Sequence, residues 1–99
     1  MDKELNRFVS DIKHSFAGAE VLLFGSRAKG TARPDSDYDL IVVSKSFKKT
    51  PFVDRARDVW LSSKAAIAAD VFCYSPDEIK QAAKKSTVLK SALEHAAAL

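Results

Sequence analysis

The opening segment carries apolar residues at spacings of three and four: Leu5, Phe8, Val9, Ile12 and Phe16. This spacing places them on one face of a helix of about four turns. The next glycine, Gly18, is expected to end that helix.

Three short apolar runs follow, and each predicts a strand. Residues 21–24 (VLLF) are too few for a buried helix, residues 38–43 are rich in β-branched and apolar side chains, and residues 66–74 (AIAADVFCY) stop at a Ser-Pro pair. Between the first two runs, the segment after Gly25 is expected to begin a helix whose first amides Ser26 can cap.

Further helices are predicted after residue 50. The first opens at Pro51 and turns an apolar face to the core: Phe52, Ala56, Val59 and Trp60. Its charged residues are expected to fall largely elsewhere: Asp54, Arg55, Arg57 and Asp58. Residues 75–78 (SPDE) form a capping box with Pro at the first helical position, and Ser86 with Thr87 can cap the chain again, so two helices are expected, 76–85 and 87–97. The alternation of helices and strands is typical of an α/β or α+β fold.

Length and composition narrow the class of protein. A chain of 99 residues is expected to form one domain, 1–99, and its formal charge of +3 is too small to indicate a nucleic-acid or membrane partner. Cys73 is the single cysteine, so no internal disulfide can form. Neither a signal peptide nor an apolar run of roughly 20 residues is present, which favours a cytoplasmic protein with no membrane contact.

Two aspartates mark the start of the second predicted strand. Asp37 and Asp39 are two residues apart, so their carboxylates project to the same face and repel each other. Mg²⁺ takes such oxygens as ligands and relieves the repulsion, which predicts a metal site. The alternative is structural: residues 35–37 are turn formers and Asp39 lies at an exposed strand edge.

The end of the first predicted strand suggests a place for phosphate. Gly25 and Ser26 lead from a strand into a helix, where free backbone amides and the helix dipole receive anions. Thr31 stands where the P-loop motif needs a lysine, so this motif is excluded. A plain turn followed by a helix cap is the structural alternative.

Together these residues form a Gly-Ser-x10-Asp-x-Asp pattern between two strands. The segment GSRAKGTARPDSDYDL resembles the DNA polymerase β superfamily of nucleotidyltransferases, and within it the minimal nucleotidyltransferases. The resemblance covers most of the chain, with residues 44–65 matching loosely. It implies a polymerase β-like fold with a short, mixed, three-stranded sheet flanked by four or five helices.

The resemblance also implies the roles of site residues. Gly25, Ser26 and Arg27 would hold the phosphates of ATP, and Asp37 with Asp39 would hold two Mg²⁺ ions. Arg27 can equally be a solvated helix residue. The family needs a third carboxylate on a neighbouring strand, and Asp70 fills this place; it would ligate one ion and accept a proton. An aspartate inside an apolar strand is costly to bury, which by itself marks Asp70 as functional.

The second substrate and the partner follow from the resemblance too. Minimal nucleotidyltransferases are commonly antitoxins of HEPN-domain toxins, so the implied reaction transfers AMP from ATP to a hydroxyl, of Tyr or another residue, on such a toxin. The elements use nearly the whole chain, which leaves little to form a pocket for a small acceptor. Two alternatives remain open: a binding module that masks the toxin, and transfer to a small molecule such as an antibiotic.

Several other residues receive no functional role. Lysine clusters at 45–49 and 80–85 are expected on solvated faces, so no direct nucleic-acid binding is predicted. His14 and His95 stand singly on predicted helices, where surface or helix-end positions are expected rather than zinc ligation. Cys73 is expected to be an apolar filler.

Overall fold

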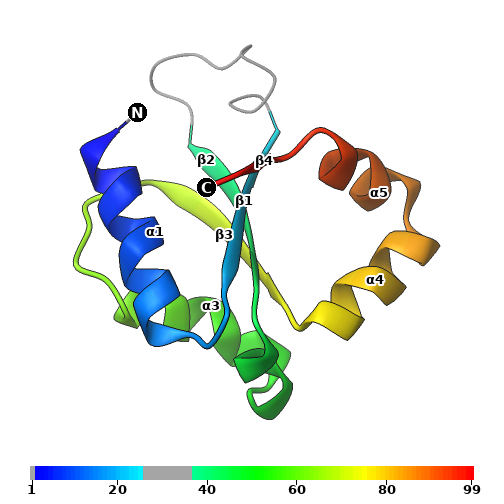
Figure 1. Ribbon diagram of the computed structural model, residues 1–99, viewed down its shortest axis with the longest axis horizontal. Coiled ribbons are helices and arrows are strands. Elements are labelled where there is room, and N and C mark those ends of the chain that lie inside the picture. The colour runs from blue at the N-terminus through cyan, green and yellow to red at the C-terminus, as the bar shows by residue number, and fades with distance from the viewer. Residues whose placement is uncertain (1, 26–36) are drawn as a thin grey trace.

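The structure is a computed structural model and describes residues 2–25 and 37–99. Figure 1 shows the arrangement of the elements. In chain order they are α1 (Lys3–Ser15), β1 (Glu20–Phe24), β2 (Tyr38–Val43), the 3-10 helix η1 (Lys45–Lys49), α3 (Phe52–Leu61), β3 (Ala69–Tyr74), α4 (Pro76–Lys85), α5 (Thr87–Glu94) and β4 (Ala97–Ala98). In this described part of the chain, no helix is both long and apolar enough to span a membrane.

The strands form one mixed sheet in the order β3-β2-β1-β4. β2 and β3 run parallel, whereas β1 pairs antiparallel with both β2 and β4. The predicted mixed sheet flanked by helices is therefore confirmed, with one strand more than expected. The additional strand forms because α5 ends at Glu94 rather than at 97, and the chain then returns along β1, where Leu99 N donates to the carbonyl of Val21 at 2.9 Å.

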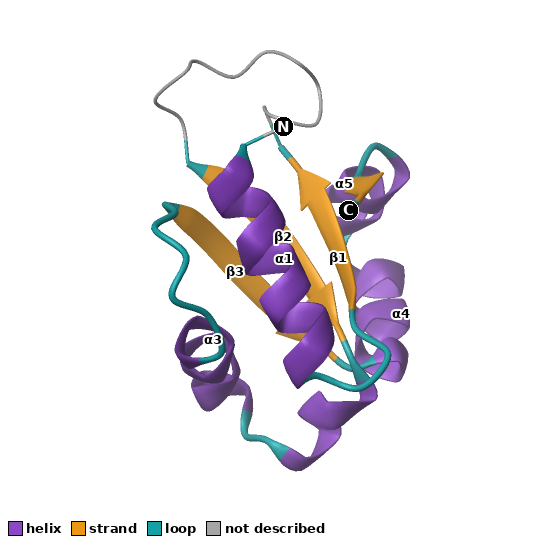
Figure 2. Ribbon diagram, turned by 60° about the vertical axis from the view of Figure 1, so that its left-hand side comes forward, coloured by secondary structure: helices purple, strands orange, loops and turns teal. Residues whose placement is uncertain are grey.

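Helices cover both faces of the sheet. α1 and α3 lie on one face, and α4 with α5 lie on the other, as the turned view in Figure 2 also shows. The core lies between the sheet and the first pair of helices: Leu5, Phe8, Ile12, Val21, Leu23, Leu40, Val42 and Val59 are all buried. Burying a side chain of this size stabilises the fold by roughly 1.5–3 kcal/mol. Alternation along β2 therefore sends Leu40 and Val42 to this core and Asp39 and Ile41 to the opposite face.

The prediction for α3 is only half right. Val59 is buried and Trp60 stacks on Phe8 with ring centroids 4.8 Å apart, as expected of a core-facing side. Phe52, however, is 59% exposed, and Arg55, which was expected to fall away from the core, is 4% exposed. Arg55 can be buried because hydrogen bonds to its guanidinium offset the cost of removing this charge from water.

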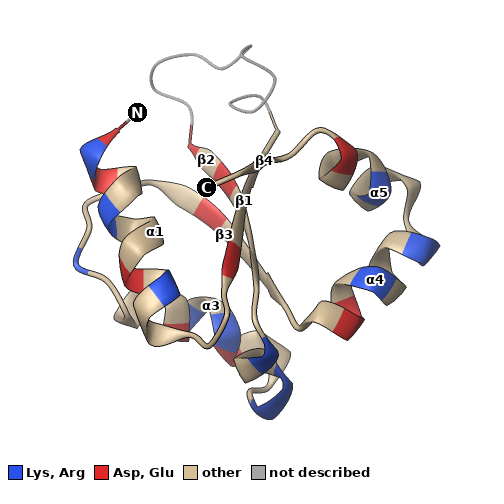
Figure 3. Cartoon of the chain, in the orientation of Figure 1, with Lys and Arg blue, Asp and Glu red and all other residues tan. Residues whose placement is uncertain are grey.

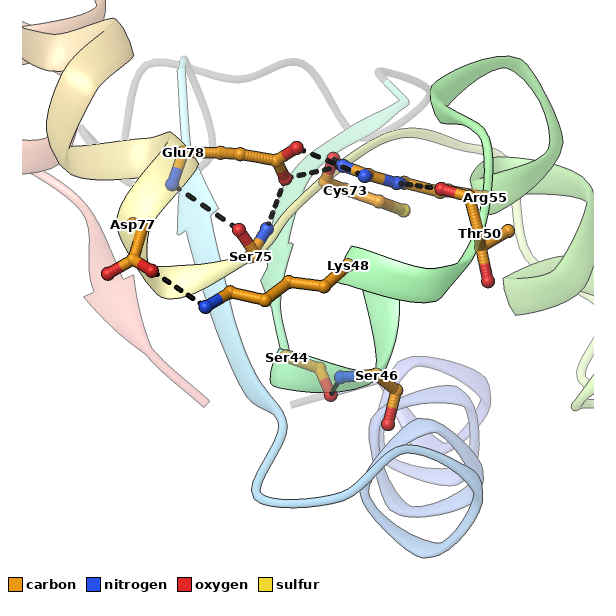
Figure 4. Close-up of polar contacts among 9 residues, drawn as sticks. All are labelled: Ser44, Ser46, Lys48, Thr50, Arg55, Cys73, Ser75, Asp77 and Glu78. Atoms are coloured by element: carbon orange, nitrogen blue, oxygen red, sulfur yellow. Dashed lines mark hydrogen bonds and ion pairs between the residues drawn. The ribbon is translucent and has the colours of Figure 1, made fainter.

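Figure 4 shows Arg55 of α3 bonded both to Glu78 of α4 and to Thr50, just before α3. Its NH1 and NH2 groups donate to the two carboxylate oxygens of Glu78 at 2.6 and 3.1 Å, and its Nε donates to the carbonyl of Thr50 at 2.9 Å. Glu78 also accepts from the backbone N–H of Ser75 at 2.7 Å, and the predicted capping box is confirmed. This network fixes the direction in which α4 leaves β3.

Candidate functional site

Two of the three predicted carboxylates lie side by side. Asp39 of β2 and Asp70 of β3 are register partners in the parallel pair, so their side chains leave the same face of neighbouring strands roughly 5 Å apart. That face is the one covered by α4 and α5, because Leu40 and Val71 on either side of them pack toward the core on the other face. Figure 3 shows acidic positions on both strands.

Asp37 completes the acidic group. It comes directly before β2 and two residues before Asp39, which directs both side chains to the same face. Partial burial, then repulsion from Asp70 and then repulsion from Asp37, raises the pKa of Asp39 above its usual value. Asp39 therefore lies within electrostatic reach of both other carboxylates, and a bound cation would relieve this repulsion.

Gly25 lies against this acidic group. It follows β1, whose last residue, Phe24, pairs with Asp39. Its φ of +74° lies in the left-handed region, and a Cβ placed on it would overlap the Oδ2 of Asp39, closer than the 3.0 Å that real Cβ atoms keep. A glycine is thus needed here on two counts, and the start of the predicted phosphate site lies next to the carboxylates.

The rest of the predicted phosphate site falls in the undescribed segment. Ser26 and Arg27, together with the helix expected after Gly25, lie outside the described residues.

Asp70 is not buried, contrary to the expectation from its apolar strand. An aspartate within an apolar strand was expected to be buried at a cost in free energy. Asp70 is exposed, however, and it is the side chain of its neighbour Val71 that packs against the core. Burial therefore does not mark Asp70 as functional. Its exposure instead leaves the carboxylate accessible to a substrate.

The donor chemistry suits a hard divalent cation, although the ligands are not gathered around one point. Carboxylate oxygens are the ligands that Mg²⁺ prefers, and Asp37, Asp39 and Asp70 are the residues that could supply them. Within residues 2–25 and 37–99, no group of three His, Cys, Asp or Glu side chains is arranged to hold a metal ion. Ion binding would therefore require these carboxylates to turn toward one another from their positions on the two strands.

α5 contributes a wall that the sequence did not predict. A cleft beside Gly25 is lined by Phe24, by Val88 and Ser91 of α5, and by His95, which caps that helix. These positions share one side of a helix, but no pattern in the sequence indicates which part of the sheet that side faces. Their place beside the site emerges only from the tertiary structure.

Comparisons with known proteins agree with this geometry. The family described as "Nucleotidyltransferase domain" matches residues 3–96. The crystal structure of a candidate nucleotidyltransferase from Sulfolobus solfataricus is 29% identical in sequence and superimposes with a TM-score of 0.65, covering 80% of this chain and 70% of that one. No curated protein matches the chain.

The match spans the acidic group, both neighbouring strands and Gly25, and the solved structure has a similar fold. The polymerase β-like architecture inferred from the sequence is therefore confirmed. The chain belongs to the nucleotidyltransferase domain family.

Proposed function

We propose that this protein is a Mg²⁺-dependent nucleotidyltransferase that transfers AMP from ATP to a tyrosine hydroxyl of a HEPN-type toxin and so acts as its antitoxin. The observation that carries the transferase part is the register pairing of Asp39 with Asp70 on one face, beside Gly25. Family membership supports nucleotidyl transfer in general. The choice of AMP and of a protein acceptor rests on the resemblance of the segment 25–40 to minimal nucleotidyltransferases.

The reaction is an in-line displacement at the α-phosphorus. The acceptor oxygen forms a bond to this phosphorus while the bond to the bridging oxygen breaks and pyrophosphate leaves. Bound Mg²⁺ ions would neutralise the charge that develops on the attacking and leaving oxygens. Asp37 and Asp39 would hold these ions, and Asp70 would help hold one and take the proton of the acceptor hydroxyl.

Exposure of Asp70 supports an acceptor carried by another macromolecule. The carboxylate that would take the proton lies at the surface of β3, and β3 is an edge strand. A side chain presented by a second protein can therefore approach it without passing through the core.

The test is incubation with α-labelled ATP, Mg²⁺ and the toxin encoded beside this protein, followed by mass spectrometry of the toxin. Label and one or more added AMP groups on a hydroxyl residue are expected, and Asp39→Asn or Asp70→Asn should abolish them. Glu20→Gln serves as the matched control, because Glu20 is an exposed carboxylate on the same sheet away from the site. Absence of label with the wild-type protein would refute the proposal.

A second candidate function is masking of the toxin without catalysis. It is favoured by the exposed apolar side chains of Phe52, Val53 and Leu61 on α3, which offer a surface that a partner protein could cover. The two functions differ in their response to substitution. Neutralisation of the toxin that survives both Asp37→Asn and Asp70→Asn would favour masking, whereas its loss would favour transfer.

A further inference from the structure

A cleft separates α5 from the sheet beside Gly25. It has a volume of about 450 Å³, with Phe24 on its sheet side and Val88, Ser91 and His95 on its helix side. A second cavity of about 180 Å³ continues along the same sheet face and shares Phe24 and Val88 with it. Cavities of this combined size suit a small organic ligand.

The walls of this cleft expose apolar surface that folding alone would be expected to bury. Phe72 and Val88 are 43% and 80% exposed, and both line the continuous cavity. Phe72 lies beside Phe24, with ring centroids 5.9 Å apart and ring planes at 60°. A flat, apolar ligand could stack against one of these aromatic rings and contact the exposed aliphatic side chain beside them.

The position of the cleft indicates which kind of ligand it would bind. Gly25 lines the cleft and also lies against the acidic group, since a Cβ on it would overlap Asp39. A triphosphate held at Gly25, as the proposed function requires, would place its nucleoside within reach of the cleft. The inference therefore rests on the proposed function and on the continuity of the two sites.

His95 supplies a polar group with a defined role. Its Nδ1 lies 2.9 Å from the backbone carbonyl of Ser91. A carbonyl can only accept, so Nδ1 carries the proton and Nε2 of the neutral ring is left as an acceptor. Adenine and cytosine carry an exocyclic amino group that donates, whereas guanine and uracil carry a carbonyl at the corresponding position, which cannot.

We propose that the cleft between Phe24 and α5 is the nucleobase subsite. His95 selects adenine and cytosine, whose amino group lies at purine C6 or pyrimidine C4, over bases with a carbonyl at that position. Stacking on Phe24 holds any base, and the hydrogen bond to His95 discriminates among them. This goes beyond the transfer reaction, because it assigns base choice to His95, which caps the C-terminal end of α5 and is not part of the acidic group.

The test is binding of three Mg²⁺-loaded probes to the whole chain at pH 8, followed by calorimetry: ATP, GTP and inorganic tripolyphosphate. Binding of ATP at least about tenfold tighter than tripolyphosphate is expected from base stacking, and about fivefold tighter than GTP from one hydrogen bond. Ala92→Trp should fill the cleft and bring ATP down to the affinity of tripolyphosphate. His95→Phe should keep the stacking but remove the preference for ATP over GTP.

Lys90→Trp is the matched control, because Lys90 lies on α5 but does not line the cleft. For each variant, the affinity for ATP is divided by the affinity for tripolyphosphate. A change in the net charge of the protein affects both affinities alike and therefore cancels in this ratio. If all three probes bind alike to the wild-type protein, or if Ala92→Trp leaves the ratio unchanged, the nucleobase subsite is refuted while the phosphate site stands. If none of the probes binds, the proposed function itself fails.

Discussion

Replacing Gly25 with Ala tests whether close contact between this residue and Asp39 matters for transfer. The substitution has two effects. Alanine at a φ of +74° costs roughly 1–2 kcal/mol of folding stability, because a Cβ in the left-handed region clashes with its own backbone. The same Cβ would also overlap the Asp39 carboxylate, which must move by on the order of 1 Å, and a displacement of that size lowers a reaction rate by roughly 100-fold.

Gly18→Ala separates the two effects. Gly18 has a similar φ of +60°, but a Cβ on it would meet nothing within 4 Å. Both variants should therefore lose a similar free energy of unfolding in urea denaturation, and only Gly25→Ala should lose nucleotidyl transfer. If both variants keep nucleotidyl transfer equally well, or if both lose activity in proportion to stability, the contact between Gly25 and the carboxylate does not position the site.

Other predictions concern the parts that hold the site in place. Glu78→Gln leaves the buried Arg55 without its counter-ion and should cost about 2 kcal/mol in urea denaturation, a figure reduced because the Glu78 side chain is 44% exposed. Asp77→Asn, one residue away, breaks an exposed ion pair with Lys48 and removes one charge from the first turn of α4, so it should lower the denaturation midpoint much less. Hydrogen bonds from Arg55 lower the pKa of Glu78 to about 2 from 4.5, so the stability from this carboxylate is complete above pH 4.5 and is lost as the pH falls toward 2. Acid titration of Glu78→Gln should lack that loss; an identical acid transition in both proteins would contradict it. Burial raises the pKa of the Cys73 thiol to about 12, so a thiol reagent at pH 8 should label it only upon unfolding, and rapid labelling of the folded protein would contradict this.

Local patterns in the sequence predicted the elements well. The capping box at Ser75 and the β-branched run after Tyr38 set the start of α4 and the position of β2, because both signals act within a few residues of chain. The pairing of Asp39 with Asp70 required a further step, since no local rule states which strands lie side by side. Resemblance to a family supplied that step.

The features that the sequence did not predict depend on tertiary contacts. Arg55 is charged and was expected at the surface, but Glu78 reaches it only once α3 and α4 are packed on the sheet. The pairing of β4 has the same origin, because Ala97 and Ala98 have little strand propensity of their own and extend along β1 once α5 ends. Physical rules for isolated segments cannot anticipate such contacts.

Because β2 and β3 pair in a fixed parallel register, the position of Asp70 depends on the exact number of residues in β3. One amino acid inserted within β3 before Asp70 would slide the strand by one place and send this carboxylate to the opposite surface of the sheet, among the packed side chains. The same insertion in the connection 62–68 would be absorbed without any such inversion. Natural length variation between relatives is therefore expected to gather in that connection and to avoid the strand.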